Sequence, residues 1–392
     1  MCAPTEPNAT TAATTTTSSP NSTTTTAQEN DKQEYYCLDV WAIPPEMYTL
    51  TNEERKKTLP TVHRHHKGPF PPNSLTTPSP ITLSEEVTAI IMLLIIIGGP
   101  LLWIWSTIAA LLFGSWKIRT AAVLISTILA YHPLPSSPEF SEKAMASTYT
   151  QCLYKYFSYR FVWKNDALQK VQNAEPFLAA GPPHGVLPIA NLLSIPGTNV
   201  LGCMKFVGAP ASIVFRTPFL RYMTLYPSIH VDRASIIKNI VENGTSTGLV
   251  PDGIAGIFKQ SDHAEVVALK HRKGMARLAL STGTPIIPAY SFNNTAAFSA
   301  WWDPYGILEN ISRKMQASLF LYWGRFGCCP IPRRVQITMV YGEPIRVDKV
   351  EGGNPTVEQV DELHERILDG IRDCFESHKH ALGLGEKELI FE

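Results

Sequence analysis

A single histidine stands where a short apolar run gives way to a helical pattern. Residues 177–180 are apolar enough for a buried strand, and Gly181 with the two prolines after it ends that strand before His184. Residues 186–193 then favour a helix. The N–H groups and the positive dipole end of a helix disfavour imidazolium, so we predict that His184 is a neutral base able to take a proton from a hydroxyl. A loop histidine that only hydrogen-bonds its own turn is the alternative.

Two carboxylates follow predicted strands and are candidates to orient that histidine. Asp232 comes after the apolar residues 228–231, and Asp252 comes after residues 248–250. Loops that follow strands are where open α/β sheets gather their sites. Either aspartate would suit the second ring N–H of His184. Each also fits the simpler role of a turn or helix-capping residue.

A basic segment opens a further predicted helix at residues 273–280. Its cations, Lys270, Arg272, Lys273 and Arg277, would suit the phosphates of a nucleotide-bearing co-substrate, and a solvated basic helix face explains them equally well.

The residues Gly244-Thr245-Ser246-Thr247-Gly248 match the GxSxG pattern of serine hydrolases. That nucleophile elbow requires a strand before the serine and a helix after it. Here the order is reversed, because a predicted helix at 234–241 precedes the pattern and a predicted strand follows it. We therefore predict a helix-to-strand turn.

Composition limits the partners. Among the 392 residues, 34 Lys and Arg balance 34 Asp and Glu, and this absence of a basic excess argues against nucleic acid. The seven cysteines provide neither a disulfide framework nor metal-ligand spacing. We expect a catalytic region that faces the reducing cytosol, with no metal.

No charged residue lies between Glu86 and Lys117, and this apolar stretch is long enough to cross a bilayer. Gly98-Gly99-Pro100 is predicted to bend it, and a second apolar patch follows at residues 121–130. Basic residues flank the region on both sides. We predict a membrane hairpin over residues 87–131 with both ends cytosolic; a single span and a buried core helix are the alternatives.

The remaining chain divides in two. Residues 1–80 are rich in Thr, Ser and Pro and are predicted to be a disordered tail. Residues 140–392 alternate short apolar runs with helical patterns, which is typical of an α/β domain. The predicted strands are 177–180, 200–206, 228–231, 248–250, 285–290 and 335–341, and the predicted helices are 234–241, 273–280 and 356–375.

Several fragments in this order resemble the type-2 diacylglycerol acyltransferases and their monoacylglycerol and wax-synthesising relatives. The resemblance runs from about residue 88 to the C-terminus, and its motifs are Pro183-His184-Gly185, Phe215-Arg216-Thr217-Pro218-Phe219-Leu220-Arg221, Val231-Asp232-Arg233, Arg272-Lys273-Gly274-Met275-Ala276-Arg277, Ile287-Pro288-Ala289-Tyr290 and Gly342-Glu343-Pro344-Ile345.

Two departures distinguish this chain from that family. Pro182 stands where the family often has the first histidine of His-Pro-His-Gly. The family's acid-terminated Gly-Gly segment is replaced by Asp252-Gly253, so that this block is similar to the Pro-Glu-Gly block of the glycerol-phosphate acyltransferases. Their His-x4-Asp pair is absent, because Ile189 occupies the acid position.

The resemblance implies a membrane-anchored α/β acyltransferase domain that makes triacylglycerol by direct transfer from acyl-CoA to diacylglycerol. It implies catalytic roles for His184 and Asp252, with backbone N–H groups at the helix start stabilising the oxyanion. The residues implied to bind substrate are Pro183, Gly185, Arg216, Asp232, Arg233, Arg272, Lys273 and Gly274.

It further implies an endoplasmic reticulum membrane location, membrane lipid as a partner, and acyl-CoA as co-substrate without a resident cofactor or metal. A lipid-droplet location and a homo-oligomer stay open, as do monoacylglycerol, wax-alcohol and lysophospholipid acceptors. Two other classes compete: an interfacial lipase, which would need Ser246, and a membrane-shaping scaffold, which would need neither His184 nor the basic helix start.

Overall fold

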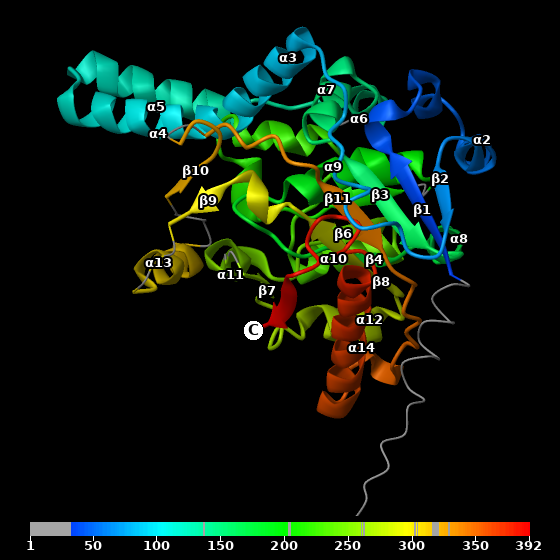
Figure 1. Cartoon of the computed structure of the whole chain (residues 1–392). Helices are drawn as coiled ribbons and strands as arrows, with labels where there is room; N and C mark the ends of the chain where they lie inside the picture. Colours follow the sequence, from blue (N-terminus) through cyan, green and yellow to red (C-terminus); the bar gives the residue numbers. More distant parts are fainter. Residues whose placement is uncertain are drawn as a thin grey trace, which may run out of the picture.

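An eight-stranded mixed sheet forms the centre of the molecule (Figure 1). The computed structural model describes residues 33–392 apart from 136–137, 203–204, 260, 262, 302, 304, 316–320 and 328–329. The strands follow the order β2-β1-β3-β11-β8-β4-β6-β5. Their bounds are β1 Glu34–Asp39, β2 Arg64–Lys67, β3 Arg160–Lys164, β4 Leu178–Ala180, β5 Phe206–Gly208, β6 Ser246–Leu249, β8 Ile286–Phe292 and β11 Thr338–Tyr341.

Helices cover both faces of this sheet, as alternation along the strands shows. In β11, Met339 and Tyr341 join one apolar core with helices α7 and α9, whereas Val340 joins a second core with α10, α12 and α14. β8 is buried along its whole length, as expected for a strand packed on two sides. These helices are α7 Thr148–Tyr156, α9 Ile189–Val200, α10 Arg233–Val241, α12 Gly274–Thr282 and α14 Val357–Glu376.

Smaller elements surround these layers. They include helices α2 Asn52–Thr58, α6 Pro138–Met145, α8 Ala167–Asn173, α11 Gly253–Phe258 and α13 Ile307–Met315, the 3-10 turns η5 Ser212–Phe215 and η6 Leu220–Leu225, and the strand pairs β7 Ala264–Val267 with β12 Glu388–Phe391 and β9 Ser299–Ala300 with β10 Tyr322–Trp323.

Most of the predicted strands and helices of the α/β domain are present within a few residues. The predicted capping box exists at Thr356 and Gln359, where α14 begins. Two strand predictions are wrong. Residues 189–200 form α9 and the strand begins only at Phe206, while Ser228 makes an isolated bridge to Gly208 instead of starting a strand.

The prediction of a disordered tail to residue 80 is wrong for residues 33–80, and residues 1–32 lie outside the described residues. β1 pairs antiparallel with β3, and β2 extends the sheet beyond it. The alternate residues Tyr35 and Cys37 are buried, so this polar-looking segment adds an apolar stripe to the core. Asp39 accepts a hydrogen bond of 2.6 Å from the buried Arg160 guanidinium.

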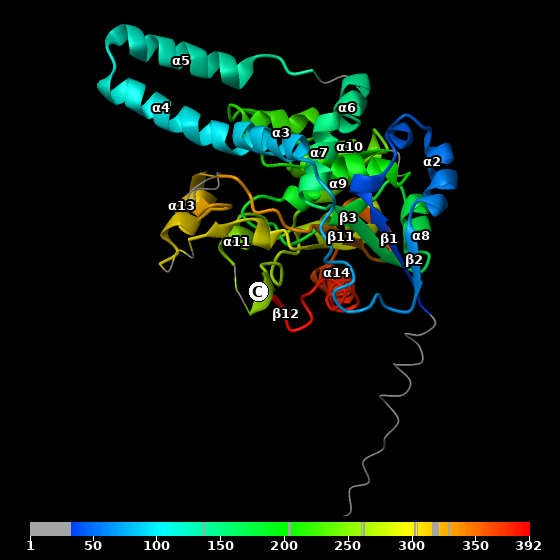
Figure 2. The ribbon, with the colours of Figure 1, turned by 45° about the horizontal axis from the view of Figure 1, so that its top comes forward.

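The apolar region forms a helical hairpin that projects from the body (Figures 1 and 2). Helix α3, Leu83–Leu93, continues through a π-helical segment, Leu94–Gly98, into α4, Gly99–Phe113, and α5, Trp116–Tyr131, returns beside α4. Gly98-Gly99-Pro100 do not reverse the chain, because these residues continue the helix, with Phe219 packed closely on Gly99. The chain reverses instead at Gly114 and Ser115.

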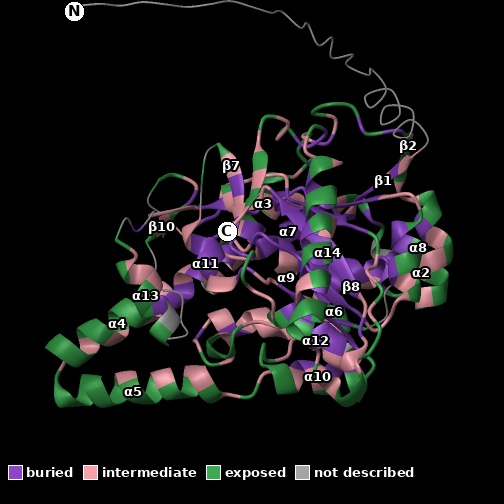
Figure 3. Ribbon diagram, turned by 90° about the horizontal axis from the view of Figure 1, so that it is seen from below, coloured by how far each residue is buried: buried purple, intermediate pink, exposed green. Residues whose placement is uncertain are grey.

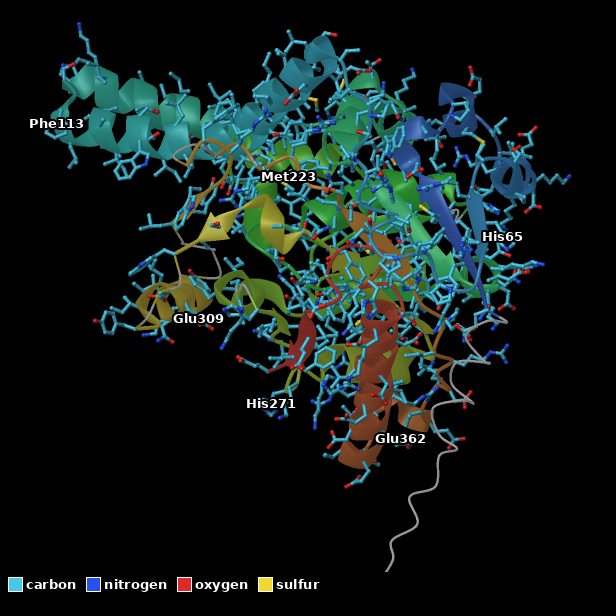
Figure 4. The ribbon with its side chains drawn as sticks, viewed as in Figure 1. His65, Phe113, Met223, His271, Glu309 and Glu362 are labelled. Carbon is cyan, nitrogen blue, oxygen red and sulfur yellow. The ribbon has the colours of Figure 1, made fainter. Side chains whose placement is uncertain are left out.

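The projecting hairpin has apolar side chains without protein cover. Helices α4 and α5 are largely exposed in Figure 3, in contrast to the buried centre of the sheet. Leu102 is 72% exposed, and Phe113, at the hairpin tip in Figure 4, is 87% exposed. By length and composition, Leu83–Phe113 could cross a membrane. Lys117 and Arg119, two of the basic residues predicted to flank the apolar region, follow the tip directly and so lie away from the base of the hairpin.

Candidate active site

Three adjacent strands bring the principal polar residues together. β4 lies between β6 and β8 and runs parallel to both, with Ala180 opposite Leu249 and Pro288. The loops that leave the carboxyl ends of these strands therefore converge. They carry His184 after β4, Asp252 after β6 and Asn294 after β8.

His184 is half-buried in the loop between β4 and α9, as its position in the sequence predicts. Its ring Nδ1 lies 2.8 Å from the carbonyl oxygen of Gly185. Because a carbonyl can only accept a hydrogen bond, this contact holds the proton on Nδ1 and leaves the lone pair on Nε2. The neutral ring is therefore arranged to act as a base through Nε2.

Asp252 contacts the same loop but not in the way we predicted. Its Oδ2 accepts a hydrogen bond of 2.8 Å from the backbone N–H of His184, while the Gly185 carbonyl takes the ring N–H. Asp252 is fully buried, and its Oδ1 has no hydrogen-bond partner among the described residues. It therefore positions the histidine loop and places negative charge beside it.

Burial raises the pKa of Asp252 above its ordinary value, and the neighbouring His184, its backbone N–H and Arg272 oppose that rise. Close backbone packing also fixes the carboxylate. A Cβ at Gly256 would lie 2.0 Å from Asp252 Oδ2, so only glycine leaves room for the carboxylate there.

Asn294 is a buried residue that the sequence analysis missed. Its Nδ2 donates to the carbonyl oxygens of Pro183, His184 and Leu187 at 3.2, 2.7 and 3.2 Å, and its Oδ1 accepts from the Ala190 N–H at 3.0 Å. One amide thus ties the whole loop from Pro183 to the start of α9. A lone asparagine after a strand gives no local signal of this role.

Pro183 and Gly185 belong to the site through their backbones. The Pro183 carbonyl also accepts a hydrogen bond from the Ser291 hydroxyl at 3.1 Å. Gly185 has a φ of +59°, and a Cβ there would lie 3.0 Å from Asn294 Nδ2. Glycine therefore suits both the left-handed backbone and the close approach of the amide.

The predicted oxyanion donors at the helix start are engaged elsewhere. α9 begins at Ile189, five residues after His184, and the Ile189 N–H donates to the Leu187 carbonyl at 2.9 Å. The Ala190 N–H is bonded to Asn294. The prediction is wrong for these two N–H groups in this arrangement.

Other predicted substrate residues have different contacts. Asp232 caps α10 by accepting from the Ser235 N–H and hydroxyl at 2.9 and 2.7 Å, and the pKa of its carboxyl is lowered by the Ser235 hydroxyl. The next residue, Arg233, reaches Ser281. The Arg216 guanidinium lies over the Tyr131 ring, 5.9 Å from its centroid, where α5 rejoins the body.

The basic residues at the start of α12 have different neighbours. Arg272 points toward α11, since a Cβ at Gly253 would lie 3.3 Å from its guanidinium. Lys273 instead pairs with Asp361 on α14 at 2.7 Å. A Cβ added to Gly274 would meet open space.

On the other side of the histidine loop lies a small apolar cavity of about 30 Å³. It separates the hairpin base from the loop, with Leu93 and Ile97 on one side and Leu187 and Ile189 on the other. Met223 lines it too, where the hairpin meets the body in Figure 4.

Ser246 lies inside β6 and is fully buried, and its hydroxyl accepts a hydrogen bond of 3.1 Å from the Phe177 N–H. The predicted order is confirmed, because α10 precedes the GxSxG pattern and strand β6 begins at its serine. A nucleophile elbow does not exist here.

Comparison with known proteins agrees with the motifs around this site. The family model described as diacylglycerol acyltransferase matches residues 112–392, which include all three converging loops. The chain belongs to the diacylglycerol acyltransferase family. The resemblance inferred from the sequence is thereby confirmed.

Relatives within the family differ in the substrates that their names give. The chain is 30% identical to human acyl-CoA wax alcohol acyltransferase 2 over 45% of its own length and 56% of that protein. It is 30% identical to zebrafish (Danio rerio) diacylglycerol O-acyltransferase 2 over 53% of its length and 62% of the relative. The match to mouse acyl-CoA wax alcohol acyltransferase 2 is 28% identical and covers 68% of this chain and 85% of that protein.

The first two alignments thus span less than two thirds of each relative. Among solved structures, the 1-acyl-sn-glycerophosphate (LPA) acyltransferase of Thermotoga maritima aligns with 73% of this chain and 94% of its own, at 14% identity and a TM-score of 0.35. That TM-score is too low to establish a shared fold.

Proposed function

We propose that this protein is a membrane-bound acyl-CoA:diacylglycerol O-acyltransferase that forms triacylglycerol by direct transfer. The observation that carries the proposal is the fixed tautomer of His184, whose Nδ1 faces the Gly185 carbonyl while Asp252 holds the same loop. Membership of the diacylglycerol acyltransferase family supports the reaction class.

In the proposed reaction, Nε2 of His184 removes the proton of the acceptor hydroxyl as that oxygen attacks the thioester carbonyl. The resulting tetrahedral intermediate collapses, the C–S bond breaks, and the imidazolium returns its proton to the CoA thiolate. The products are an ester and free CoA. Asp252 favours the imidazolium because its carboxylate lies against the loop in a buried position, where charges are poorly screened.

The surroundings of His184 fit two substrates of opposite solubility. Arg272 lies beside Asp252 on one side, and the apolar cavity lies toward the hairpin on the other. We propose that the exposed hairpin enters the bilayer and that the lipid acceptor approaches His184 from its base. Helices α4 and α5 have 15 and 16 residues, which at about 1.5 Å per residue is shorter than a hydrocarbon core of about 30 Å. A hairpin that enters and returns fits this length.

The location that we propose is the endoplasmic reticulum membrane, with the α/β domain facing cytosolic acyl-CoA. A location on lipid droplets and assembly into a homo-oligomer are both compatible with the hairpin and with the family. Monoacylglycerol and wax alcohols are the alternative acceptors, because relatives that carry these names match at similar identity.

The test is an acceptor panel. Membranes containing the full chain are incubated with labelled palmitoyl-CoA and with diacylglycerol, monoacylglycerol, hexadecanol or lysophosphatidic acid in turn, and the products are identified. We expect triacylglycerol to dominate. A dominant wax ester or diacylglycerol product would show that the preferred acceptor is a different alcohol. The absence of a labelled ester with every alcohol tested would overturn the proposed reaction.

A further inference from the structure

An open hollow of about 750 Å³ lies beside α11. Its walls come from α11, the turn before α12, α13 and the C-terminal strand β12. In Figure 4, His271 and Glu309, which both line the hollow, lie on the side of the molecule where Figure 1 shows the C-terminus. None of these walls belongs to the apolar cavity at the hairpin base.

The hollow is lined by both charged and apolar residues. Lys259, Lys270 and Arg272 line it with His271, against the two carboxylates Glu309 and Glu392. Ala255, Ala268 and Phe391 supply apolar surface. Cations next to apolar surface suit a ligand that combines phosphates with a flat ring.

The cations are available to a ligand to different degrees. Lys259 pairs with Glu392 at 2.6 Å, but both side chains are more than a third exposed, so an incoming phosphate can replace the carboxylate at small cost. Within the described part of the chain, the Lys270 side chain has no carboxylate at ion-pair distance. Lys270 is therefore the clearest cation to test.

The hollow is connected to the reactive histidine through one short helix. Ala255 lines the hollow and belongs to α11, which begins directly after Asp252. Arg272 lines the hollow as well and lies against Gly253. A ligand bound here thus begins about one helical turn from the carboxylate that holds His184.

The C-terminal wall is fixed in place by two kinds of contact. β12 pairs in parallel with β7, with Phe391 opposite Val267. Lys387, just before β12, pairs at 2.8 Å with Glu265, which is 5% exposed. These contacts anchor the C-terminal strand to the domain and keep Phe391 and Glu392 at the hollow.

We propose that this hollow binds the nucleotide end of acyl-CoA, with its phosphates on Lys270, Arg272 and Lys259. The flexible pantetheine arm would then extend along α11 and bring the thioester to His184. This inference rests on the proposed acyl-CoA reaction and adds a location for the donor. The acyl chain would continue toward the apolar cavity on the membrane side.

Two exposed lysines, one at the hollow and one away from it, provide a matched test. Lys270→Ala should raise the KM for palmitoyl-CoA about tenfold with kcat little changed, because a charge-assisted phosphate contact is lost. Lys238→Ala is the control, since Lys238 is an exposed lysine on α10 that does not line the hollow. Glu392→Gln should lower KM, because it frees Lys259 from its carboxylate.

Binding of free CoA and of dephospho-CoA to the same purified variants completes the test. The parent should bind CoA more tightly than dephospho-CoA. Lys270→Ala should either reduce this difference in affinity or weaken the binding of both ligands. Two outcomes would overturn the location while transfer itself continues: equal KM effects of Lys270→Ala and Lys238→Ala, or an unchanged KM in the double variant Lys270→Ala with Lys259→Ala. If no acyl transfer is found, the proposed function fails, and CoA binding still decides the site.

Discussion

The backbone N–H of His184 donates to Oδ2 of Asp252 at 2.8 Å, while the ring of that histidine is held by the carbonyl of Gly185. In a catalytic triad, one carboxylate both fixes the tautomer of the histidine and stabilises its charged form. Here these two tasks belong to two different groups. The carbonyl selects the tautomer, and the carboxylate positions the loop and supplies charge. Substitutions at His184 and Asp252 should consequently have different signatures.

His184→Ala should lower acyl transfer by about 10²–10⁴, the usual effect of removing a general base. Ser246→Ala should keep the turnover of the folded protein, because Ser246 is buried inside β6. It should nevertheless cost about 1–3 kcal/mol of stability, since the buried Phe177 N–H loses its acceptor. The measurement is triacylglycerol formation in membranes at matched protein levels. An inactive, well-folded Ser246→Ala with an active His184→Ala would contradict these roles.

Asp252→Asn separates activity from stability. Because burial raises the pKa of Asp252 in the folded state, its contribution to stability is fully present below the unfolded pKa and is lost as pH rises through the folded pKa. Ionisation of this buried carboxyl therefore destabilises the fold. We expect the Asn variant to have an equal or higher Tm at pH 7 but a strongly reduced kcat.

The pH–rate profile of Asp252→Asn distinguishes a positioning role from a purely structural one. Burial raises the pKa of Asp252 and asparagine cannot ionise, so the part of the pH dependence that comes from this carboxyl should be absent from the variant. A parent-like kcat and profile would make Asp252 a turn residue without a role in transfer.

Local patterns predicted the elements whose stability is local. The capping residue Thr356 and a clear apolar stripe define α14, and Gly181 with its prolines marks the end of β4. The strand predicted from residue 200 is absent, and the helix before it includes Pro196 and Gly197, two residue types that are unfavourable inside helices. In the structure both lie within α9, where Gly197 allows contact with Phe161: a Cβ there would lie 2.5 Å from that ring.

Long-range pairing explains what the sequence could not predict. β1 is defined by its register with β3, in which Tyr35 lies opposite Lys164, more than a hundred residues away. The active site follows the same rule. His184 and Asp252 were predictable as residues after strands, but the assignment of the ring N–H to Gly185 and the role of Asn294 depend on how adjacent loops meet.

Asn294→Asp should disrupt the loop more than its volume change suggests. Three carbonyl oxygens that now receive Nδ2 would face a carboxylate, and buried acceptors without donors cost about 1–3 kcal/mol. We expect a large loss of kcat and faster hydrogen exchange at residues 184–190. Asn293→Gly is the control, because it keeps the left-handed backbone and loses only the contact with Gln336. Equal activity of both variants would show that Asn294 has no role in the active site.

Gly99→Val tests how the hairpin is attached. A Cβ at Gly99 would lie 2.6 Å from Cγ of Phe219, so any side chain must displace that ring. We expect a loss of about 1–3 kcal/mol and reduced transfer, since the hairpin base borders the histidine loop. Gly98→Ala should be milder, because its Cβ would lie 3.3 Å from Pro330. The reverse order of the two variants would show that Phe219 does not hold the hairpin.

The hairpin itself should anchor the protein to membranes. Its apolar side chains are exposed, and burial in hydrocarbon is not screened by salt as electrostatic attachment is. The parent should therefore remain in membranes washed with alkaline carbonate. Leu102→Lys with Leu124→Lys, at positions 72% and 58% exposed on α4 and α5, should release it, because each lysine costs about 3 kcal/mol inside a bilayer. Val357→Lys, at a 64% exposed position on α14, should leave it bound. Release of the parent, or equal retention of all three proteins, would contradict insertion of this hairpin.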